Sequence, residues 1–173
     1  MKSWIKYTIT FVSVMVFRLM PFRAPNVEPI MATIMPLGKV YGSVMSFVFG
    51  FLSIVLYDSV TSGFGIWTLI TALAYGALGV GATYFFKKRS GWRNYALYAV
   101  IATIFYDGIT GLTIGPLFFH QSFMMSLVGQ IPFTILHLIG NVSFAIVLSP
   151  VIEKWMAKSE VAVVRKELVV LVS

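Results

Sequence analysis

Long apolar runs separated by short polar breaks dominate the chain. The runs Val40 to Tyr57 and Ile66 to Phe86 flank a polar turn at Asp58 to Gly63. Each run is long enough for a helix across the hydrocarbon core of a bilayer, which takes about 20 residues. Three further helices are predicted at Trp4 to Met20, Asn94 to Tyr106 and Ile131 to Ile152. The pattern therefore predicts an all-α membrane protein.

Two stretches depart from this pattern. Asn26 to Leu37 is apolar but short, and about ten helical residues reach only about 15 Å, half the hydrocarbon core. It is predicted to be a short sheltered helix or a re-entrant piece. Asp107 to Val128 contains Gly108, Gly111, Gly115 and Pro116, and is predicted to be too broken for a spanning helix. We expect a bundle of six transmembrane helices, or five if Asn26 to Leu37 does not cross.

Composition and charge support a membrane location. Of 173 residues, 58% are hydrophobic and 11% are charged, whereas charged residues make up about 25% of a soluble domain. The chain has no cysteine, which excludes disulfides and thiolate metal sites. We expect one transmembrane domain, residues 1–156, and a cytoplasmic tail, residues 157–173.

The net charge of +7 is interpreted as a topology signal and not as nucleic-acid binding. The basic residues lie between or beyond the apolar runs, at Lys2, Lys6, Lys39, Lys87, Lys88, Arg89, Arg93, Lys154, Lys158, Arg165 and Lys166. Loops on the cytoplasmic face have this composition. It predicts a multi-pass protein of the cell membrane with a cytoplasmic C-terminus, and it favours six spans, because Lys2 and Lys6 then join the inner basic set.

A pentapeptide occurs twice. Tyr57-Asp58-Ser59-Val60-Thr61 is echoed by Tyr106-Asp107-Gly108-Ile109-Thr110. In the predicted topology both copies end helices that run outward, which is consistent with an old internal repeat. The echo places Asp58 and Asp107 at two equivalent outer helix ends.

Other polar and aromatic residues are expected at the same depth. They share helix faces at spacings of three and four, and they are Trp67, Thr71 and Tyr75 on one helix, and Gln130, Thr134, His137 and Asn141 on another. Because polar groups are costly against lipid, we expect them to point at one another or into a cavity under the segment Gly108 to Gly129. Interhelical hydrogen bonds would also explain Thr71 and Asn141, helix capping would explain Asp58 and Asp107, and an interfacial aromatic belt would explain Trp67.

Two small-residue ribs, Gly42-Ser46-Gly50 and Ala72-Gly76-Gly79, favour close helix packing over a partner interface. The chain has no phosphate-binding loop, no metal-ligand spacing and no nucleophile motif. It is therefore predicted to be neither an enzyme nor a cofactor protein. An intramembrane enzyme that uses Asp58 and Asp107 is the weakest alternative.

The sequence resembles the substrate-binding S components of energy-coupling factor transporters over roughly residues 4–156. The resemblance rests on the six-segment pattern and on local stretches, which are Pro25 to Pro29, Gly42 to Gly50, Asp58 to Gly63 with Trp67-Thr68, and Gln130 to Phe133 with His137, Gly140, Asn141 and Pro150. It implies a six-helix bundle that captures a vitamin or related micronutrient at its outer face. It also implies partners, a transmembrane coupling subunit and two cytoplasmic ATPases.

On this hypothesis the acids Glu28, Asp58 and Asp107 contact donors or cationic groups of the solute. Neutral hydrogen bonds come from Gln130, His137 and Asn141, and stacking surfaces come from Trp67, Tyr75 and Tyr106. Arg18 and Arg23, on the outer side, are expected to anchor a helix end, and attraction of anionic parts of the solute is the alternative. The first helix lacks the alanine pattern through which many S components meet the coupling subunit, so one of the two ribs is expected to take that role. The alternative is a non-enzymatic envelope scaffold whose polar groups only hold helices together.

Overall fold

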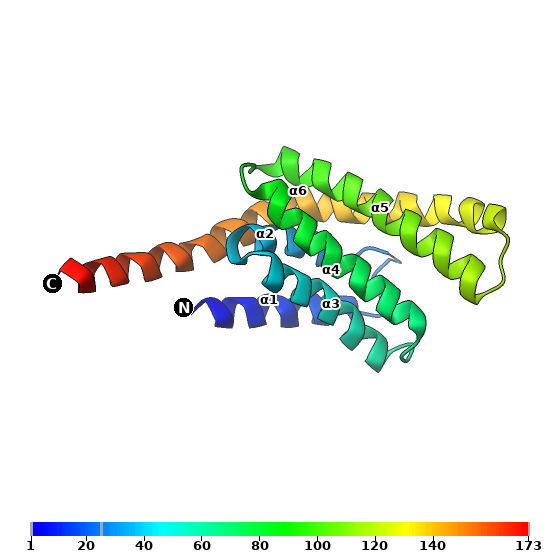
Figure 1. Cartoon of the computed structure of the whole chain (residues 1–173), viewed down its shortest axis with the longest axis horizontal. Helices are drawn as coiled ribbons and strands as arrows, with labels where there is room; N and C mark the ends of the chain where they lie inside the picture. Colours follow the sequence, from blue (N-terminus) through cyan, green and yellow to red (C-terminus); the bar gives the residue numbers. More distant parts are fainter. Residues whose placement is uncertain (1, 25, 173) are drawn as a thin grey trace.

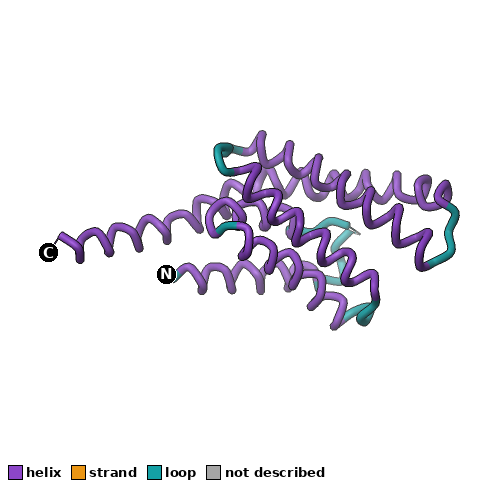
Figure 2. Tube along the Cα trace, in the orientation of Figure 1, coloured by secondary structure: helices purple, strands orange, loops and turns teal. Residues whose placement is uncertain are grey.

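The computed structural model describes residues 2–24 and 26–172, with side chains described up to Ala157. The described chain is helical throughout apart from turns and loops, and it contains no strand (Figures 1 and 2). The helices are α1 (Ser3–Arg18), α2 (Ile30–Tyr41), α3 (Ser43–Val60), α4 (Ile66–Phe86), α5 (Trp92–Phe118) and α6 (Phe123–Val172). The predicted all-α class is confirmed, and the predicted bounds of α4 match those of the structure.

Four of these helices are long and apolar enough to cross a membrane: α3, α4, α5 and the part of α6 from Phe123 to Ala157. The surface of the bundle also indicates a membrane location. Large apolar side chains on it are at least half exposed, such as Leu73 of α4, Ile101 of α5 and Ile139 of α6. A water-soluble protein rarely exposes apolar side chains on this scale. The chain is therefore a multi-pass membrane protein.

The short helix α2 is the centre of the bundle. Its 12 residues span about 18 Å, and every residue from Ile30 to Gly38 is buried. The helix packs against α3, α4 and α6. Because protein surrounds it, α2 does not need the full thickness of the bilayer. The predicted short sheltered helix is confirmed, shifted toward the C-terminus of the chain.

Consecutive helices run in alternating directions (Figure 1). One end of the bundle holds the start of α1, the junction of α2 with α3 and the turn between α4 and α5. We call it the basic end because it carries Lys39 and the residues 87–93. Glu153 of α6 ties this end together: it pairs with Lys39 Nζ at 2.6 Å and accepts a hydrogen bond from Tyr95 Oη at 2.7 Å. Residues 19–24 and 26–29 and the α3–α4 turn lie toward the opposite end.

Helices α3 and α4 approach so closely that their backbones touch at glycines. A Cβ atom on Gly50 would lie 2.8 Å from the Tyr75 carbonyl oxygen, and one on Gly79 would lie 2.7 Å from the Ser46 carbonyl oxygen. The predicted packing role of the two ribs is confirmed. The expectation that a rib meets a coupling subunit stays a prediction: Gly50, Gly76 and Gly79 face the neighbouring helix inside the bundle, whereas a Cβ on Gly42 would have no atom within 4 Å.

The prediction of a broken segment at Asp107 to Val128 is also wrong. Helix α5 continues through it to Phe118, and α6 begins at Phe123. The glycines do not interrupt α5 because α6 side chains fill the space that they leave: Gly111 faces Gln130, and Gly115 faces Ser126. Pro116 falls in the last turn of α5. Asp107 therefore lies inside a helix and not at a helix end equivalent to that of Asp58.

The predicted tail, residues 157–173, falls on the last part of α6. The backbone of α6 runs to Val172, and the side chains beyond Ala157 lie outside the described residues.

Candidate functional site

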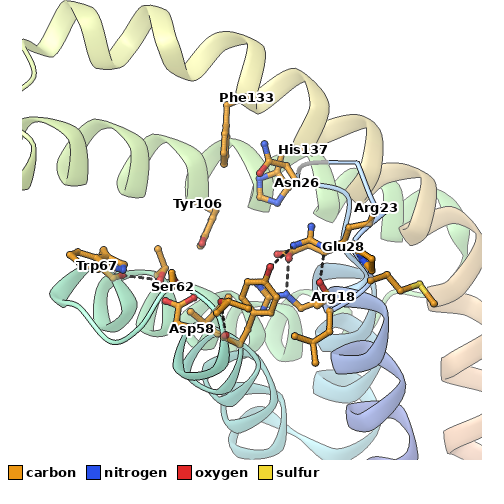
Figure 3. Close-up of a pocket in the computed structure, with 17 residues that line it drawn as sticks. Arg18, Arg23, Asn26, Glu28, Asp58, Ser62, Trp67, Tyr106, Phe133 and His137 are labelled. Atoms are coloured by element: carbon orange, nitrogen blue, oxygen red, sulfur yellow. Dashed lines mark hydrogen bonds and ion pairs between the residues drawn. The ribbon is translucent and has the colours of Figure 1, made fainter.

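A cavity of about 600 Å³ opens at the end of the bundle opposite the basic end. Its walls come from the end of α1, the following loop, the ends of α3 and α4 that meet at their turn, and the middle of α5 and α6. Four charged side chains line it: Arg18, Arg23, Glu28 and Asp58. The aromatic part of the wall is formed by Tyr57, Trp67, Tyr106 and Phe133 (Figure 3).

Arg18 and Glu28 form a buried ion pair at the base of this wall. Arg18 Nε lies 2.8 Å from Glu28 Oε2, and the two side chains are 6% and 9% exposed. The Arg18 guanidinium also lies 4.0 Å from the centre of the Tyr57 ring. A charge this far from water is tolerated only with a partner, so each residue fixes the position of the other.

A chain of hydrogen bonds continues from Glu28 through the bundle. Tyr75 Oη of α4 lies 3.0 Å from Glu28 Oε1 and 3.3 Å from His137 Nε2 of α6. His137 Nδ1 in turn lies 2.8 Å from Asp107 Oδ1 of α5. The chain thus links α1, the loop after it, α4, α6 and α5, and we call it the buried network. It fixes the outline of the cavity wall, since its members His137, Glu28 and Arg18 line the cavity.

Hydrogen-bond counting assigns the protons of this network. The carboxylate of Glu28, ion-paired with Arg18, can only accept hydrogen bonds. Tyr75 Oη therefore donates its single hydroxyl proton to Glu28. Nε2 of His137 must therefore be the donor toward Tyr75 Oη. The short contact of His137 Nδ1 with Asp107 Oδ1 then needs one more proton, held by either partner. In both cases the pair of His137 and Asp107 has no net charge.

Asp58 is held differently. It lies in the last turn of α3, is partly exposed, and its Oδ2 accepts a hydrogen bond from Thr68 Oγ1 at 2.7 Å. Thr68 is at the start of α4, where its hydroxyl also accepts from the Gly65 backbone N–H. The carboxylate is therefore fixed at the α3–α4 turn with one oxygen open to the cavity.

Arg23 is the cation of the cavity that has no acidic partner in the described part of the chain. Its Nε donates to the Arg18 carbonyl oxygen at 2.9 Å, and its Nη2 donates to Tyr57 Oη at 3.1 Å. Neither contact neutralises its charge. The side chain is half-buried in the loop that covers the cavity, so an anionic group there would find a fixed guanidinium.

The predicted site residues fall into three groups. Glu28, Asp58, Trp67, Thr71, Tyr106 and His137 line the cavity. Tyr75 and Asp107 lie behind the wall, bonded to His137. The last three lie outside the lining: Asn141 donates to Thr103 Oγ1 at 2.8 Å, and Gln130 donates to Thr134 Oγ1 at 3.3 Å.

The predicted cover is replaced by another segment. No residue between Gly108 and Gly129 lines the cavity, and His120, predicted to belong to the cover, lies in the turn between α5 and α6. The loop after α1 covers it instead, through Leu19, Met20, Pro21 and Asn26. The reason is that α5 and α6 continue as helices past the level of the cavity.

Sequence reasoning left Arg18, Arg23 and Tyr57 out of the site, because it favoured helix anchoring for the two arginines. A signal was present for Arg18: it and Glu28 are opposite charges ten positions apart, and charges inside a membrane bundle are costly unless they pair. In the described residues no group of three or more His, Asp or Glu side chains could hold a metal ion.

A comparison of the chain with models of protein families, with curated proteins and with solved structures finds no match.

Proposed function

We propose that the chain is the solute-binding subunit of an importer of the energy-coupling factor type. It would capture a small water-soluble metabolite, such as a vitamin, from the outer face of the cell membrane. The basic end would be cytoplasmic, together with the C-terminus, as cytoplasmic loops are enriched in lysine and arginine. The cavity then opens outward.

The observation that carries the proposal is a charged cavity in a protein whose surface is apolar. A volume of about 600 Å³ is in the usual range for small-molecule sites. Fixed charges in a membrane bundle are costly and typically mark solute pathways or binding sites. Here Arg18, Arg23, Glu28 and Asp58 gather on one cavity at the end of the bundle opposite the basic end.

The open groups of the wall describe the solute. Arg23 has no acidic partner among the described residues and suits a carboxylate or phosphate group, whereas the open oxygen of Asp58 suits an amine or amide donor. Tyr106 and Phe133 project into the space between them and offer ring faces (Figure 3). A solute with an anionic end, a planar middle and a donor end fits this arrangement.

Import would require the coupling subunit and two ATPases. The chain has no phosphate-binding loop of its own, so the energy of transport would have to come from partners. The docking surface would lie away from Gly50 and Gly79, since these two glycines face the neighbouring helix inside the bundle.

The test begins with mass spectrometry of small molecules that remain bound to the full chain purified in detergent. The identified solute is then titrated against the unmodified protein and against the variants Arg23→Gln and Asp58→Asn. Each variant loses a charge-assisted hydrogen bond, and we expect it to bind about ten-fold more weakly or worse. Glu153→Gln is the matched control: it removes a carboxylate at the basic end, and solute affinity should not change.

One observation favours the alternative of an envelope scaffold. The buried network satisfies most of its own polar groups without any ligand, as interhelical contacts alone would. The same experiment separates the two functions. A purified chain that retains no small molecule and binds none of a panel of charged metabolites would remove the importer proposal and leave the scaffold.

A further inference from the structure

A second cavity, of about 420 Å³, lies between α1 and α6 and shares no lining residue with the first. Its walls are mostly apolar, with Ile9, Val14 and Phe17 from α1 and Phe144, Leu148 and Ile152 from α6. From Ile9 to Phe17 it runs about 12 Å along α1. We call it the α1–α6 groove.

The two threonines that line the groove do not require a polar ligand. Thr10 Oγ1 donates to the Lys6 carbonyl oxygen at 2.8 Å, and Thr33 Oγ1 donates to the Pro29 carbonyl oxygen at 2.8 Å. Both hydroxyls are thus satisfied by their own backbone segment. An apolar chain is the occupant that such a lining accepts without loss.

A cation, Lys6, lies at the end of the groove that Trp155 lines. Lys6 lies one turn before Ile9 on α1, is 5% exposed, and donates to the carbonyl oxygen of Trp155, which lines the groove. Its ammonium also lies 5.3 Å from the centre of the Trp155 ring. In the described residues no acid pairs with it, since Glu153, on the neighbouring turn of α6, is paired with Lys39.

The exposed charged side chains around this end are basic. Lys2 directly precedes α1, Lys154 directly precedes Trp155 on α6, and neither has an acidic partner among the described residues. A nearly buried ammonium with only a carbonyl and a ring as partners keeps an uncompensated charge. An anion that approached along the apolar groove would supply the missing partner.

We propose that the α1–α6 groove binds an anionic phospholipid, with one acyl chain between α1 and α6 and the phosphate at Lys6. The occupant is identified by the joint chemistry of the site, an apolar channel that ends at a cation at the membrane-facing edge of the bundle. Helix α1 contacts the bundle mainly through α3 and α6, so the acyl chain completes the packing of its open side. The site does not depend on the solute-binding proposal.

The test is native mass spectrometry of the full chain, released from nanodiscs that contain equal amounts of dioleoyl phosphatidylglycerol and dioleoyl phosphatidylcholine. Because the acyl chains are identical, any preference reports the headgroup. We expect about five-fold more phosphatidylglycerol adducts, the preference that one basic residue near the surface provides.

Four variants locate the site. Lys6→Gln should remove the preference, Lys6→Arg should keep it, and Lys154→Gln, the exposed lysine at the same end, should keep it as well. Leu148→Trp fills the groove and should reduce the adducts of both lipids. This last variant tests the groove even if Lys6→Gln fails to fold.

Two results would overturn the proposal. One is equal binding of the two lipids by the unmodified chain, which would show that acyl chains coat α1 without recognition. The other is a preference that Lys154→Gln lowers as much as Lys6→Gln does, which would show a diffuse surface charge instead of a site.

Discussion

The hairpins α3–α4 and α5–α6 carry a similar five-residue stretch, Tyr57 to Thr61 and Tyr106 to Thr110, and use it in opposite ways. In the first, Asp58 lies in the last turn of α3, is partly exposed and lines the cavity. In the second, Asp107 lies well inside α5, is 1% exposed and is bonded to His137. The distance from an acid to the end of its helix decides whether it meets solvent or protein. Asp58 can meet a solute, and Asp107 only holds the histidine that can.

The two hairpins also differ in how their glycines are used. In α3–α4, Gly50 and Gly79 face backbone atoms of the partner helix. In α5–α6, Gly111 faces the end of the Gln130 side chain, and Gly115 faces the side chains of Ser126 and Gln121. Backbone cannot move aside and a flexible side chain can, so the first interface is rigid and the second can adapt.

The largest expected effect distinguishes the two acids. Asp107→Ala leaves His137 in the interior without its partner, and breaking such a buried pair costs about 3–5 kcal/mol. Asp58→Ala should cost only about 1 kcal/mol, since Asp58 is partly exposed, lines the cavity and gives up one hydrogen bond, from Thr68 Oγ1. Denaturant titration in detergent micelles, followed by circular dichroism, measures both losses.

The matched control for this pair is Asp107→Asn, which keeps an acceptor of the same shape next to His137 and should lose less than Asp107→Ala. Equal losses from the two alanine variants would show that the depth of the acid does not separate the hairpins.

The glycine contrast is tested by one methyl group in each hairpin. Gly50→Ala brings a Cβ within 2.8 Å of the Tyr75 carbonyl oxygen and should lower the free energy of unfolding by about 2 kcal/mol. Gly111→Ala meets only the end of the Gln130 side chain, which can turn away, and should cost less than about 0.5 kcal/mol. The same titrations report both values. A larger loss at Gly111 would mean that α5 and α6 are the rigid pair.

A third prediction concerns Tyr75 Oη, whose contact with His137 joins the two hairpins. Tyr75→Phe removes the hydroxyl that contacts both Glu28 and His137, and should cost about 1.5–3 kcal/mol, as for other hydrogen bonds to charged groups. The ring remains, so its contact with Tyr106, at 4.4 Å between centres, is kept. A double-mutant cycle of Tyr75→Phe with His137→Gln measures the coupling. Additive losses would contradict a connected network.

Much of the fold followed from hydrophobic length alone. The helix Ile66 to Phe86 was predicted with its observed bounds, because both of its ends are marked by polar residues. The continuation of α5 could not be predicted in this way. Gly108, Gly111 and Pro116 interrupt helices in water, whereas inside this bundle the space at Gly111 is filled by Gln130. That compensation depends on the register between α5 and α6, which no single segment encodes.

The candidate site was predictable only in part for a related reason. Helical spacing correctly put Trp67 and Thr71 on one face, and both line the cavity. The same reasoning grouped His137 with Asn141, which instead bonds to Thr103. The spacing of residues determines which face of a helix they share, but not the depth at which that face lines a cavity. The missed residue Arg23 lies in a loop, where no periodicity applies.

A small effect is also expected from the pair of Thr103 and Asn141. Thr103→Val removes the hydroxyl that accepts from Asn141 Nδ2 and keeps the shape of the side chain. Both residues are fully buried and neither lines the cavity. An interhelical hydrogen bond in a membrane protein is worth about 0.6 kcal/mol on average, and we expect a loss of that size in the titration. Solute affinity should not change. A loss of affinity without a loss of stability would mean that α5 and α6 transmit their packing to the cavity wall through His137, and that the second hairpin shapes the site as directly as the first.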